Sequence, residues 1–300
     1  MIRKFIIINY TYMFFLSSTI SLCSTTSQIS CKIDGLGGTQ PDRICVLRDF
    51  LRVIQNCDNP ETNPRPVDNA IIIQGTVGVG KTSIGENFAK EVNGNFVMLR
   101  ANEIMNGSDP AKMVRDIYQK AKKDSNYGEK ICKRKPYVII LDDIDDIANI
   151  NPSTRTMSIS DGLDELRKQI SDNSNDPYII TILICNNYNF LDERLRSRCS
   201  TIRLPIPDWY NRRAIINFYA NQFPNEFDSH FLDKVASATW LFTGRDIKRI
   251  FVYTWQEAKS KNQNKLAKER LLFYLSECRD HVVSKRNYGF MCSWFRCYCG

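Results

Sequence analysis

A glycine-rich segment directly after an apolar run constrains this chain more than any other feature. The segment reads Gly75-Thr-Val-Gly-Val-Gly-Lys81-Thr82, and the run before it is Ile71-Ile72-Ile73-Gln74. Together they satisfy the pattern G-x-x-x-x-G-K-[ST], which lies between a strand and a helix. An apolar run before the loop and a helical pattern after it therefore predict a strand, a loop and a helix in that order.

A loop of this kind predicts a site for the phosphates of a nucleotide. Its glycines let backbone amides curl around a β-phosphate, and the following helix adds positive potential at its amino end. Lys81 would neutralise the β- and γ-phosphate oxygens, and the hydroxyl of Thr82 would ligate Mg²⁺. The residues expected to bind ATP are Gly75, Thr76, Val77, Gly78, Val79, Gly80, Lys81 and Thr82.

A second apolar run, residues 137–141, ends in the two carboxylates Asp142 and Asp143. Parallel sheets bind ligands at the carboxyl ends of their strands. We therefore expect Asp142 to hold Mg²⁺ together with Thr82, and Asp143 to polarise the attacking water. The competing interpretation is a solvated acidic turn formed by Asp142, Asp143, Asp145 and Asp146.

Strand-like and helical patterns alternate up to residue 207, and helical patterns alone follow. Strands are expected at residues 70–74, 96–99, 137–141 and 179–185, with helices at 82–92 and 111–123. In the second helix, Met113, Ile117 and Ala121 share one face. Strands this apolar predict a parallel sheet covered by helices on both sides, an α/β fold. The later helices are expected at 212–223, 231–238, 245–259 and 266–283.

These patterns divide the chain into five segments. Residues 1–23 are interpreted as a signal peptide or targeting segment, and residues 24–69 as a polar lead-in broken by glycine and proline. Residues 70–207 form the expected α/β nucleotide-binding domain, and residues 208–285 a small helical lid domain. Residues 286–300 form a cysteine-rich tail.

The amino terminus has the layout of a signal peptide. Arg3 and Lys4 precede a mostly apolar run over residues 5–22, and small residues precede Ser24. Polar residues interrupt the run, so cleavage is favoured over anchoring, and stable membrane anchoring is conceivable only through residues 5–22. The expected location is the secretory lumen or an organelle, or the cytosol if the start is mispredicted. In a lumen, Asn106-Gly107-Ser108 would be a glycosylation acceptor.

Composition and cysteine spacing exclude several classes of protein. With 43% hydrophobic and 25% charged residues, neither wholesale disorder nor a multi-span membrane protein is expected. The net charge of +8 comes mostly from residues 208–300, where a solvated helix face is favoured over a surface for nucleic acid or an anionic membrane. The 11 cysteines leave at least one thiol unpaired or intermolecular. Zinc is disfavoured because no common finger has the spacing of His281, Cys292, Cys297 and Cys299.

Over residues 33–261 the chain resembles the AAA+ ATPases, nearest the branch with spastin-like and proteasomal ATPases. Residues 95–104 look like the second strand of that family and the segment after it. Residues 182–192 resemble its fourth strand, sensor asparagine and Leu-Asp turn. The resemblance implies a P-loop NTPase fold, and it implies that Asn186 orients water against the γ-phosphate, with Asn187 as the alternative.

The same resemblance assigns roles to arginines. Residues 193–199 fall where the family carries paired arginines that reach into a neighbouring subunit's nucleotide. Arg198 takes the second of these positions, Ser197 replaces the first, and Arg196 is close enough to substitute. A finger of this kind implies an oligomer.

Residues 242–247 resemble the start of a lid helix in which an arginine senses the γ-phosphate. That position is occupied by Arg245. Thr243 and Asp246 also form a possible capping box, which is the structural explanation of both residues. The residues Ile247, Ile250, Phe251 and Thr254 lie on one side of the helix and are expected to be core.

The chain departs from the family at two places. Most active members have glutamate where Asp143 stands, and aspartate is shorter by one methylene, about 1.5 Å. Slow hydrolysis is therefore expected, unless Asp145 or a shifted water compensates. Residues 103–110 are shorter than the family's pore loop and lack its aromatic residue, with only Met105 nearby. This weakens the expectation that polypeptide is threaded through a central pore.

The leading hypothesis is an ATP-hydrolysing AAA+ machine that remodels a protein partner. It would act as a ring of identical or related chains on an unidentified protein client, with ATP and Mg²⁺ as cofactors. Its catalytic residues would be Asp143, Asn186, Arg198 and Arg245. One alternative is an ATP-binding scaffold subunit that scarcely hydrolyses. Another is a clamp-loader-like ATPase associated with DNA, which the amino-terminal address disfavours.

Overall fold

The computed structural model describes residues 69–126, 134–148, 157–174 and 176–285, together with residues 6–7, 15–16 and 47. Most of the predicted signal peptide, most of the lead-in and all of the cysteine-rich tail lie outside these residues, as do three of the four zinc candidates. Two short strands near the amino terminus, β1 (Ile6–Ile7) and β2 (Phe15–Leu16), pair antiparallel. Within the described part of the chain, no helix is long and apolar enough to cross a membrane.

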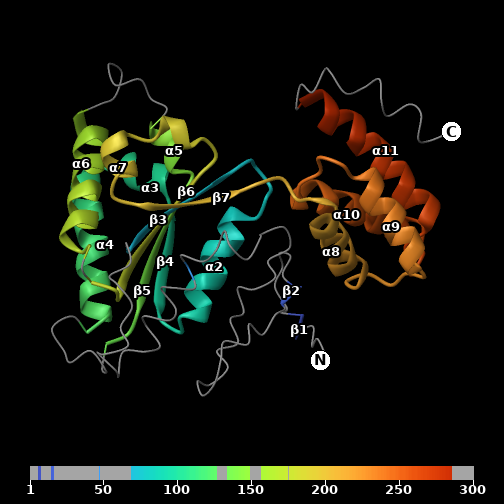
Figure 1. The fold of residues 1–300 in the computed structure, drawn as a ribbon, viewed down its shortest axis with the longest axis horizontal. Coiled ribbons are helices and arrows are strands. Elements are labelled where there is room, and N and C mark those ends of the chain that lie inside the picture. The colour runs from blue at the N-terminus through green and yellow to red at the C-terminus, as the bar shows by residue number, and fades with distance from the viewer. Residues whose placement is uncertain are drawn as a thin grey trace, which may run out of the picture.

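Five parallel strands form the central sheet (Figure 1). They are β3 (Ala70–Gly75), β4 (Asn95–Arg100), β5 (Tyr137–Asp142), β6 (Ile179–Cys185) and β7 (Ser200–Leu204). Their order is β4-β5-β6-β3-β7, and every neighbouring pair is parallel. The prediction of a parallel sheet is confirmed. This order brings the carboxyl ends of β3, β5 and β6 to adjacent places on one edge.

Helices cover both faces of the sheet, as the apolar strands predicted. One face packs on α2 (Lys81–Glu91), where Phe88 lies against alternate β6 residues such as Ile182. The other face packs on α3 (Ala101–Met105), α4 (Pro110–Asp124), α5 (Ile144–Ala148) and α6 (Met157–Asp172). Figure 1 shows α4 and α6 on one side of the sheet and α2 on the other. The edge strand β4 is less covered, and its Phe96 is 44% exposed.

The predicted face of α4 is confirmed at Ala121, which is buried, and at Ile117, which is partly buried against the core, but it is wrong at Met113. Met113 is 37% exposed, and the buried residues are Pro110, Val114, Tyr118 and Ala121. The reason is a contact with the sheet, in which the Tyr118 hydroxyl and the Thr181 hydroxyl of β6 form a buried hydrogen bond of 2.8 Å. This pair fixes the rotation of the helix about its axis.

Replacing Tyr118 with phenylalanine is expected to lower the free energy of unfolding by about 1–2 kcal/mol, because the buried Thr181 hydroxyl loses its partner. Denaturant unfolding measures this difference. The double variant Tyr118→Phe with Thr181→Val should recover most of the loss, since both polar partners are then removed. Equal stability of the single variant and the wild type would contradict the account.

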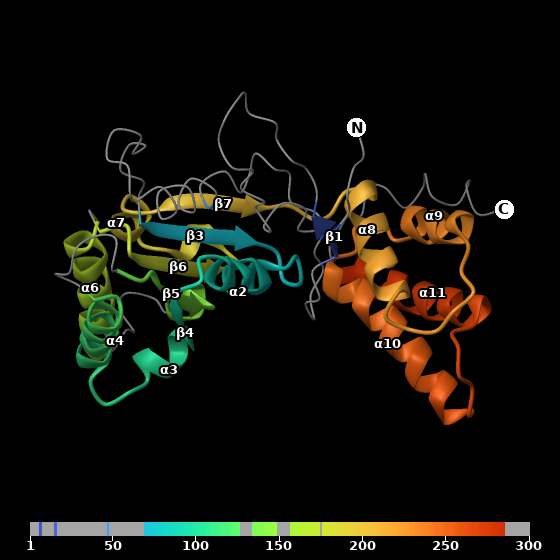
Figure 2. The ribbon, with the colours of Figure 1, turned by 90° about the horizontal axis from the view of Figure 1, so that it is seen from below.

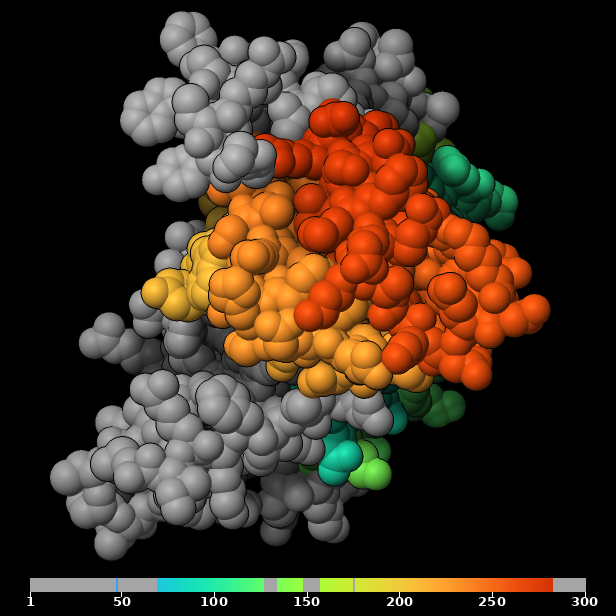
Figure 3. All heavy atoms as spheres, turned by 90° about the vertical axis from the view of Figure 1, so that its right-hand side faces the viewer, coloured from blue at the N-terminus to red at the C-terminus, as the bar shows by residue number. Residues whose placement is uncertain are grey.

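The carboxyl-terminal helices form a lid with a core of its own. They are α8 (Trp209–Ala220), α9 (Ser229–Ala238), α10 (Gly244–Ser260) and α11 (Lys268–Lys285). Figure 2 shows this group set beside the sheet, and in Figure 3 its helices form one continuous surface. The residues Ile247, Ile250, Phe251 and Thr254 are buried, as predicted. The Thr243–Asp246 capping box at the start of α10 is also confirmed.

A short link joins the sheet to the lid. The chain leaves β7 at Leu204, passes Pro205 and Pro207, and enters α8 at Trp209. The buried guanidinium of Arg212 donates to the carbonyl of Pro207 at 2.9 Å and to that of Ala236 on α9 at 3.1 Å. Pro207 is therefore tied to the lid.

Candidate nucleotide-binding site

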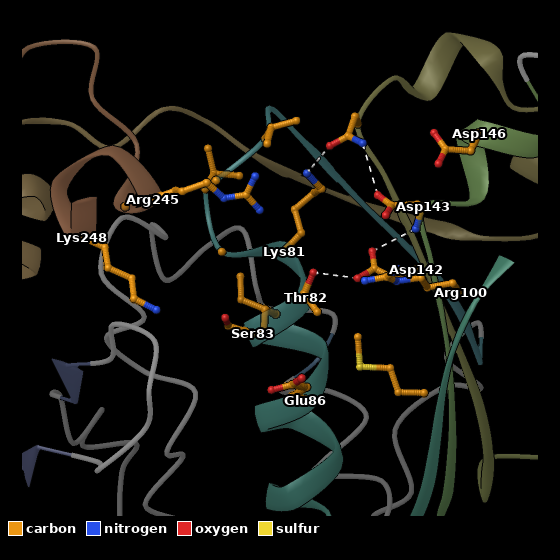
Figure 4. Close-up of a pocket in the computed structure, with 18 of the residues that line it drawn as sticks. Lys81, Thr82, Ser83, Glu86, Arg100, Asp142, Asp143, Asp146, Arg245 and Lys248 are labelled. Atoms are coloured by element: carbon orange, nitrogen blue, oxygen red, sulfur yellow. Dashed lines mark hydrogen bonds between the residues drawn. The ribbon is translucent and has the colours of Figure 1, made fainter. Parts of the chain in front are cut away.

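The glycine-rich loop turns sharply between β3 and α2 because two of its glycines adopt positive φ. Gly78 has φ of 89° and Gly80 has φ of 99°, a region that suits glycine far better than other residues. Lys81 is the first residue of α2, as the motif predicts. The loop forms one wall of a cavity of about 1150 Å³, which is large enough for a nucleotide (Figure 4).

The ammonium group of Lys81 is held at the mouth of this loop. The residue is 6% exposed, and its Nζ donates to the carbonyls of Gly75 at 2.8 Å and Thr76 at 3.2 Å. A third bond, of 2.8 Å, reaches the side-chain Oδ1 of Asn186. Burial lowers the pKa of Lys81, and the nearby carboxylates oppose that effect, with Asp142 the strongest.

Thr82 and Asp142 meet between α2 and β5. The hydroxyl of Thr82 donates to Asp142 Oδ2 at 2.9 Å, and Asp142 Oδ1 accepts the amide of Asp143. Burial raises the pKa of Asp142, and the charge of Asp143 adds to that effect. The structure thus brings together the two oxygen-bearing side chains predicted to ligate Mg²⁺, and hard oxygen donors are what this ion prefers.

Asp143 and Asn186 lie at the same end of the cavity as Lys81. Asp143 has φ of 55°, in the left-handed region that aspartate enters more readily than most residues. Its Oδ1 accepts a bond of 3.4 Å from Nδ2 of Asn186. The dashed lines in Figure 4 show that one amide therefore bridges Lys81 and Asp143.

The other two polar candidates near this point are engaged elsewhere. Asn187 Oδ1 accepts the amide of Asn189 and begins the short helix η4 (Tyr188–Phe190), so Asn186 is the better placed sensor. Asp145 is 6% exposed and accepts backbone amides, and it does not line the cavity. The suggestion that Asp145 compensates for the short reach of Asp143 is therefore not supported. The burial of Asp145 also contradicts the solvated acidic turn.

The lid supplies the far wall of the cavity. The amide of Arg245 donates to the carbonyl of Gly78 at 3.3 Å, and its exposed side chain lines the cavity. Lys248, one turn later on α10, lines the same wall and was not predicted. Its spacing of three residues from Arg245 was the available signal. Tyr219 of α8 and Arg100 of β4 were also missed.

The family is decided by sequence comparison. Residues 71–205 match the family described as "ATPase family associated with various cellular activities (AAA)". Residues 71–205 belong to the AAA family of ATPases.

Three known proteins are similar in sequence to parts of this chain. The chain is 25% identical over 205 residues to a putative 26S proteasome regulatory subunit homolog of Methanocaldococcus jannaschii, covering 67% of this chain and 52% of that protein. It is 28% identical over 130 residues to the proteasome-activating nucleotidase of Methanococcus vannielii, covering 41% and 28%. It is 25% identical over 195 residues to a cell division cycle protein 48 homolog of Archaeoglobus fulgidus, covering 60% and 24%. The chain thus spans about half or less of the length of these relatives.

Arg198 of the AAA domain lies away from the cavity. It is exposed and follows α7 (Glu193–Arg196), and its Nε donates to Ser171 Oγ of α6 at 2.7 Å. Its guanidinium also donates to the carbonyl of Arg194. Arg196, the predicted substitute, is half-buried with its guanidinium 5.1 Å from the ring centre of Tyr188. Within one chain, the structure does not bring Arg198 to Lys81.

Met105 lies in residues 103–110, the segment compared above with the family's pore loop, and its side chain is buried. Met105 is 2% exposed and packs against Gly162 of α6, where an added Cβ would lie 2.7 Å from its sulfur. Asn106, the predicted glycosylation acceptor, is exposed directly after it. Met105 is therefore a core residue.

Replacing Gly78 with alanine is expected to push the start of α10 away from the loop. An added Cβ would lie 2.6 Å from Thr243 Oγ1 and 2.8 Å from Arg245 Cβ. Gly80→Ala is the matched control, because Gly80 also has positive φ but has nothing within 4 Å of its added Cβ. Both variants bear the backbone strain, about 1–2 kcal/mol, and Gly78→Ala should lose about 1–3 kcal/mol more.

Denaturant unfolding compares the two glycine variants, and hydrogen exchange reports on the first turn of α10. Exchange there should be faster in Gly78→Ala and unchanged in Gly80→Ala. Identical behaviour of the two variants would mean that the lid does not rest on Gly78.

Proposed function

We propose that this chain is a magnesium-dependent ATPase whose turnover remodels a protein partner or complex. The observation that carries the proposal is the bridge formed by Asn186 between Lys81 and Asp143, with Thr82 and Asp142 directly beside it. A phosphate-binding cation, a candidate base and a water-orienting amide therefore meet at one end of the cavity. The names of the relatives, which include a proteasome-activating nucleotidase, support action on proteins.

The loop and its helix would hold the triphosphate. Backbone amides of the loop and the amino end of α2 would bind the phosphate oxygens, with Lys81 against the β- and γ-phosphates. Thr82 and Asp142 fit Mg²⁺, which would supply positive charge to those oxygens. Arg245, and Lys248 beside it, would face the nucleotide from the lid.

Hydrolysis needs one proton acceptor and one attacking water. Asp143 would accept a proton from the water as the water oxygen forms a bond to the γ-phosphorus. The bond from that phosphorus to the β–γ bridging oxygen breaks, and ADP leaves with the electron pair. The amide of Asn186 would orient the water, and Arg198 of a neighbouring protomer would stabilise the charge on the γ-phosphate oxygens.

Phosphate release tests the proposal. The purified wild type should release phosphate from ATP only with Mg²⁺, and Lys81→Ala should release almost none. If the wild type binds ATP yet releases no more phosphate than Lys81→Ala, the hydrolysis proposal is wrong. The ATP-binding scaffold is then the better function, and two observations favour it as second candidate: the short carboxylate at position 143 and the burial of Met105.

The raised pKa of Asp142 predicts how Mg²⁺-dependent ATP binding changes with pH. Protonated Asp142 carries no charge for the ion, so Mg²⁺-dependent ATP affinity should fall as pH decreases, starting above the ordinary carboxyl pKa of about 4. The stability contribution has the opposite sign, because a raised carboxyl pKa favours the folded state at low pH and loses that effect as pH rises. Titration of ATP binding between about pH 8 and pH 5 measures the first effect.

Asp142→Asn is the control for this titration. It should bind Mg²⁺ and ATP weakly at every pH and keep only the pH dependence that the terminal phosphate of ATP contributes by itself. A wild-type profile parallel to that of Asp142→Asn would contradict the assignment of Asp142 to the metal.

We also propose the predicted secretory or organelle location, which a carboxyl-terminally tagged copy would test in cells. The exposure of Asn106 supports its use as a reporter, because glycosylation in a lumen would increase the mass of the chain.

A further inference from the structure

Asp145 is the most deeply buried of the four acids at the end of β5 and directly after it. It is the second residue of α5, which begins immediately after Asp143. We propose that Asp145 is a positioning residue that holds the backbone of Asn186 so that its amide reaches both Lys81 and Asp143. The inference rests on the proposed function, since it assigns a role within the same site.

Two hydrogen bonds carry the inference. A single oxygen of Asp145, Oδ2, accepts the amide of Asn186 at 3.0 Å and the amide of Asn187 at 2.9 Å. Two successive amides that point at one oxygen fix the φ and ψ of Asn186, the residue between them. This backbone conformation determines the direction in which the side chain of Asn186 leaves the backbone. An ionised acceptor makes such bonds shorter and stronger than a neutral one.

These bonds join two segments that carry the reacting groups. Asp145 belongs to α5, which begins directly after Asp143, and Asn186 begins the loop that follows β6. The same two segments touch again through the Asn186 amide and the Asp143 carboxylate. Asn186 is thus held by its backbone, through Asp145, and by its side chain, through Asp143. A shift of the segment after β5 would therefore move the segment after β6 as well.

The burial of Asp145 costs free energy of folding, because only one of its two carboxylate oxygens has hydrogen-bond partners among the described residues. Its second oxygen, Oδ1, is buried and has no hydrogen-bond partner in the described part of the chain. An unsatisfied buried carboxylate oxygen is destabilising. Asp145 therefore holds the asparagine of the bridge by two hydrogen bonds, although one of its own oxygens is left without a partner in the residues that the structure describes.

Replacement of Asp145 tests the role through kinetics. Asp145→Ala removes both acceptors, while Asp145→Asn keeps the shape and one acceptor oxygen but removes the charge. Both should bind Mg²⁺ and ATP nearly as well as the wild type. We expect kcat to fall on the order of a hundredfold in the alanine variant and less in the asparagine variant. Asp161→Asn, on the exposed face of α6, is the matched control and should retain the wild-type kcat.

A double-mutant cycle separates positioning from a merely structural role. If Asp145 acts through Asn186, the double variant Asp145→Ala with Asn186→Ala should be no slower than Asn186→Ala alone. Losses that multiply would overturn the proposal. So would a fall in ATP affinity and melting temperature with unchanged kcat, or an equal loss in Asp161→Asn.

Hydrogen exchange supplies a readout that does not depend on turnover. The amides of Asn186 and Asn187 should exchange faster in Asp145→Ala and remain protected in Asn186→Ala, which keeps the backbone bonds. If the wild type does not hydrolyse ATP, the proposed function fails, but this comparison still decides the role of Asp145. Unchanged exchange in Asp145→Ala would overturn it.

Discussion

Replacing Arg198 with alanine is expected to lower kcat for ATP hydrolysis on the order of a thousandfold, while each chain still binds ATP. Arg198 is exposed and lies outside the cavity of its own chain, so the expected effect would come from an adjacent protomer of the proposed oligomer. There its guanidinium would stabilise the charge that develops on the γ-phosphate oxygens. Phosphate release at saturating ATP, together with ATP affinity, measures both parts of the expectation.

Arg194→Ala is the matched control for Arg198. Arg194 is an exposed arginine of the same helix, α7, and the variant keeps the backbone carbonyl that Arg198 contacts. It should hydrolyse ATP at close to the wild-type rate. An equal loss in both variants would indicate a general effect of charge on this surface, and no loss in either would remove Arg198 from the mechanism.

Replacing Asp143 with asparagine is expected to lower kcat by about 10²–10⁴-fold with ATP still bound, because the proton acceptor is lost. Asparagine has nearly the same shape and also tolerates the left-handed backbone of this position. The fold should therefore be retained, which a melting curve verifies. Single-turnover and steady-state phosphate release measure the loss. A rate close to that of the wild type would show that another group accepts the proton.

Mixing the two inactive variants tests whether Arg198 acts between chains. In a mixed oligomer, some interfaces pair the intact Asp143 of an Arg198→Ala chain with the intact Arg198 of an Asp143→Asn chain. Partial recovery of hydrolysis is expected, and neither variant alone should show it. A mixture that remains inactive would argue that the two residues do not share a site across an interface.

The sequence was sufficient where the signal is local. The phosphate-binding loop is contiguous, and the apolar strands before Gly75 and Asp142 are short runs that need no long-range information. The parallel sheet and the lid followed from the same patterns. The position of Asn186 came from resemblance, and the structure places it against Lys81.

The sequence was insufficient where a distant contact decides between two local possibilities. Both Met113 with Ile117 and Val114 with Tyr118 satisfy helical spacing in α4, and the bond from Tyr118 to Thr181 selects the second pair. Likewise, a run of acids does not indicate which member turns inward. Asp145 does so because the amides of Asn186 and Asn187, more than 40 residues later, both donate hydrogen bonds to its carboxylate.

The two prolines between the sheet and the lid limit how the lid can move. Proline has a nearly fixed φ, and Arg212 ties the carbonyl of Pro207 to the lid. Any rotation of the lid would therefore be confined to a few torsions around Ile206, and the packed core of the lid would move as one body. If a bound nucleotide displaced Arg245, the lid would rotate about this link. The link would then determine both the direction and the extent of the rotation.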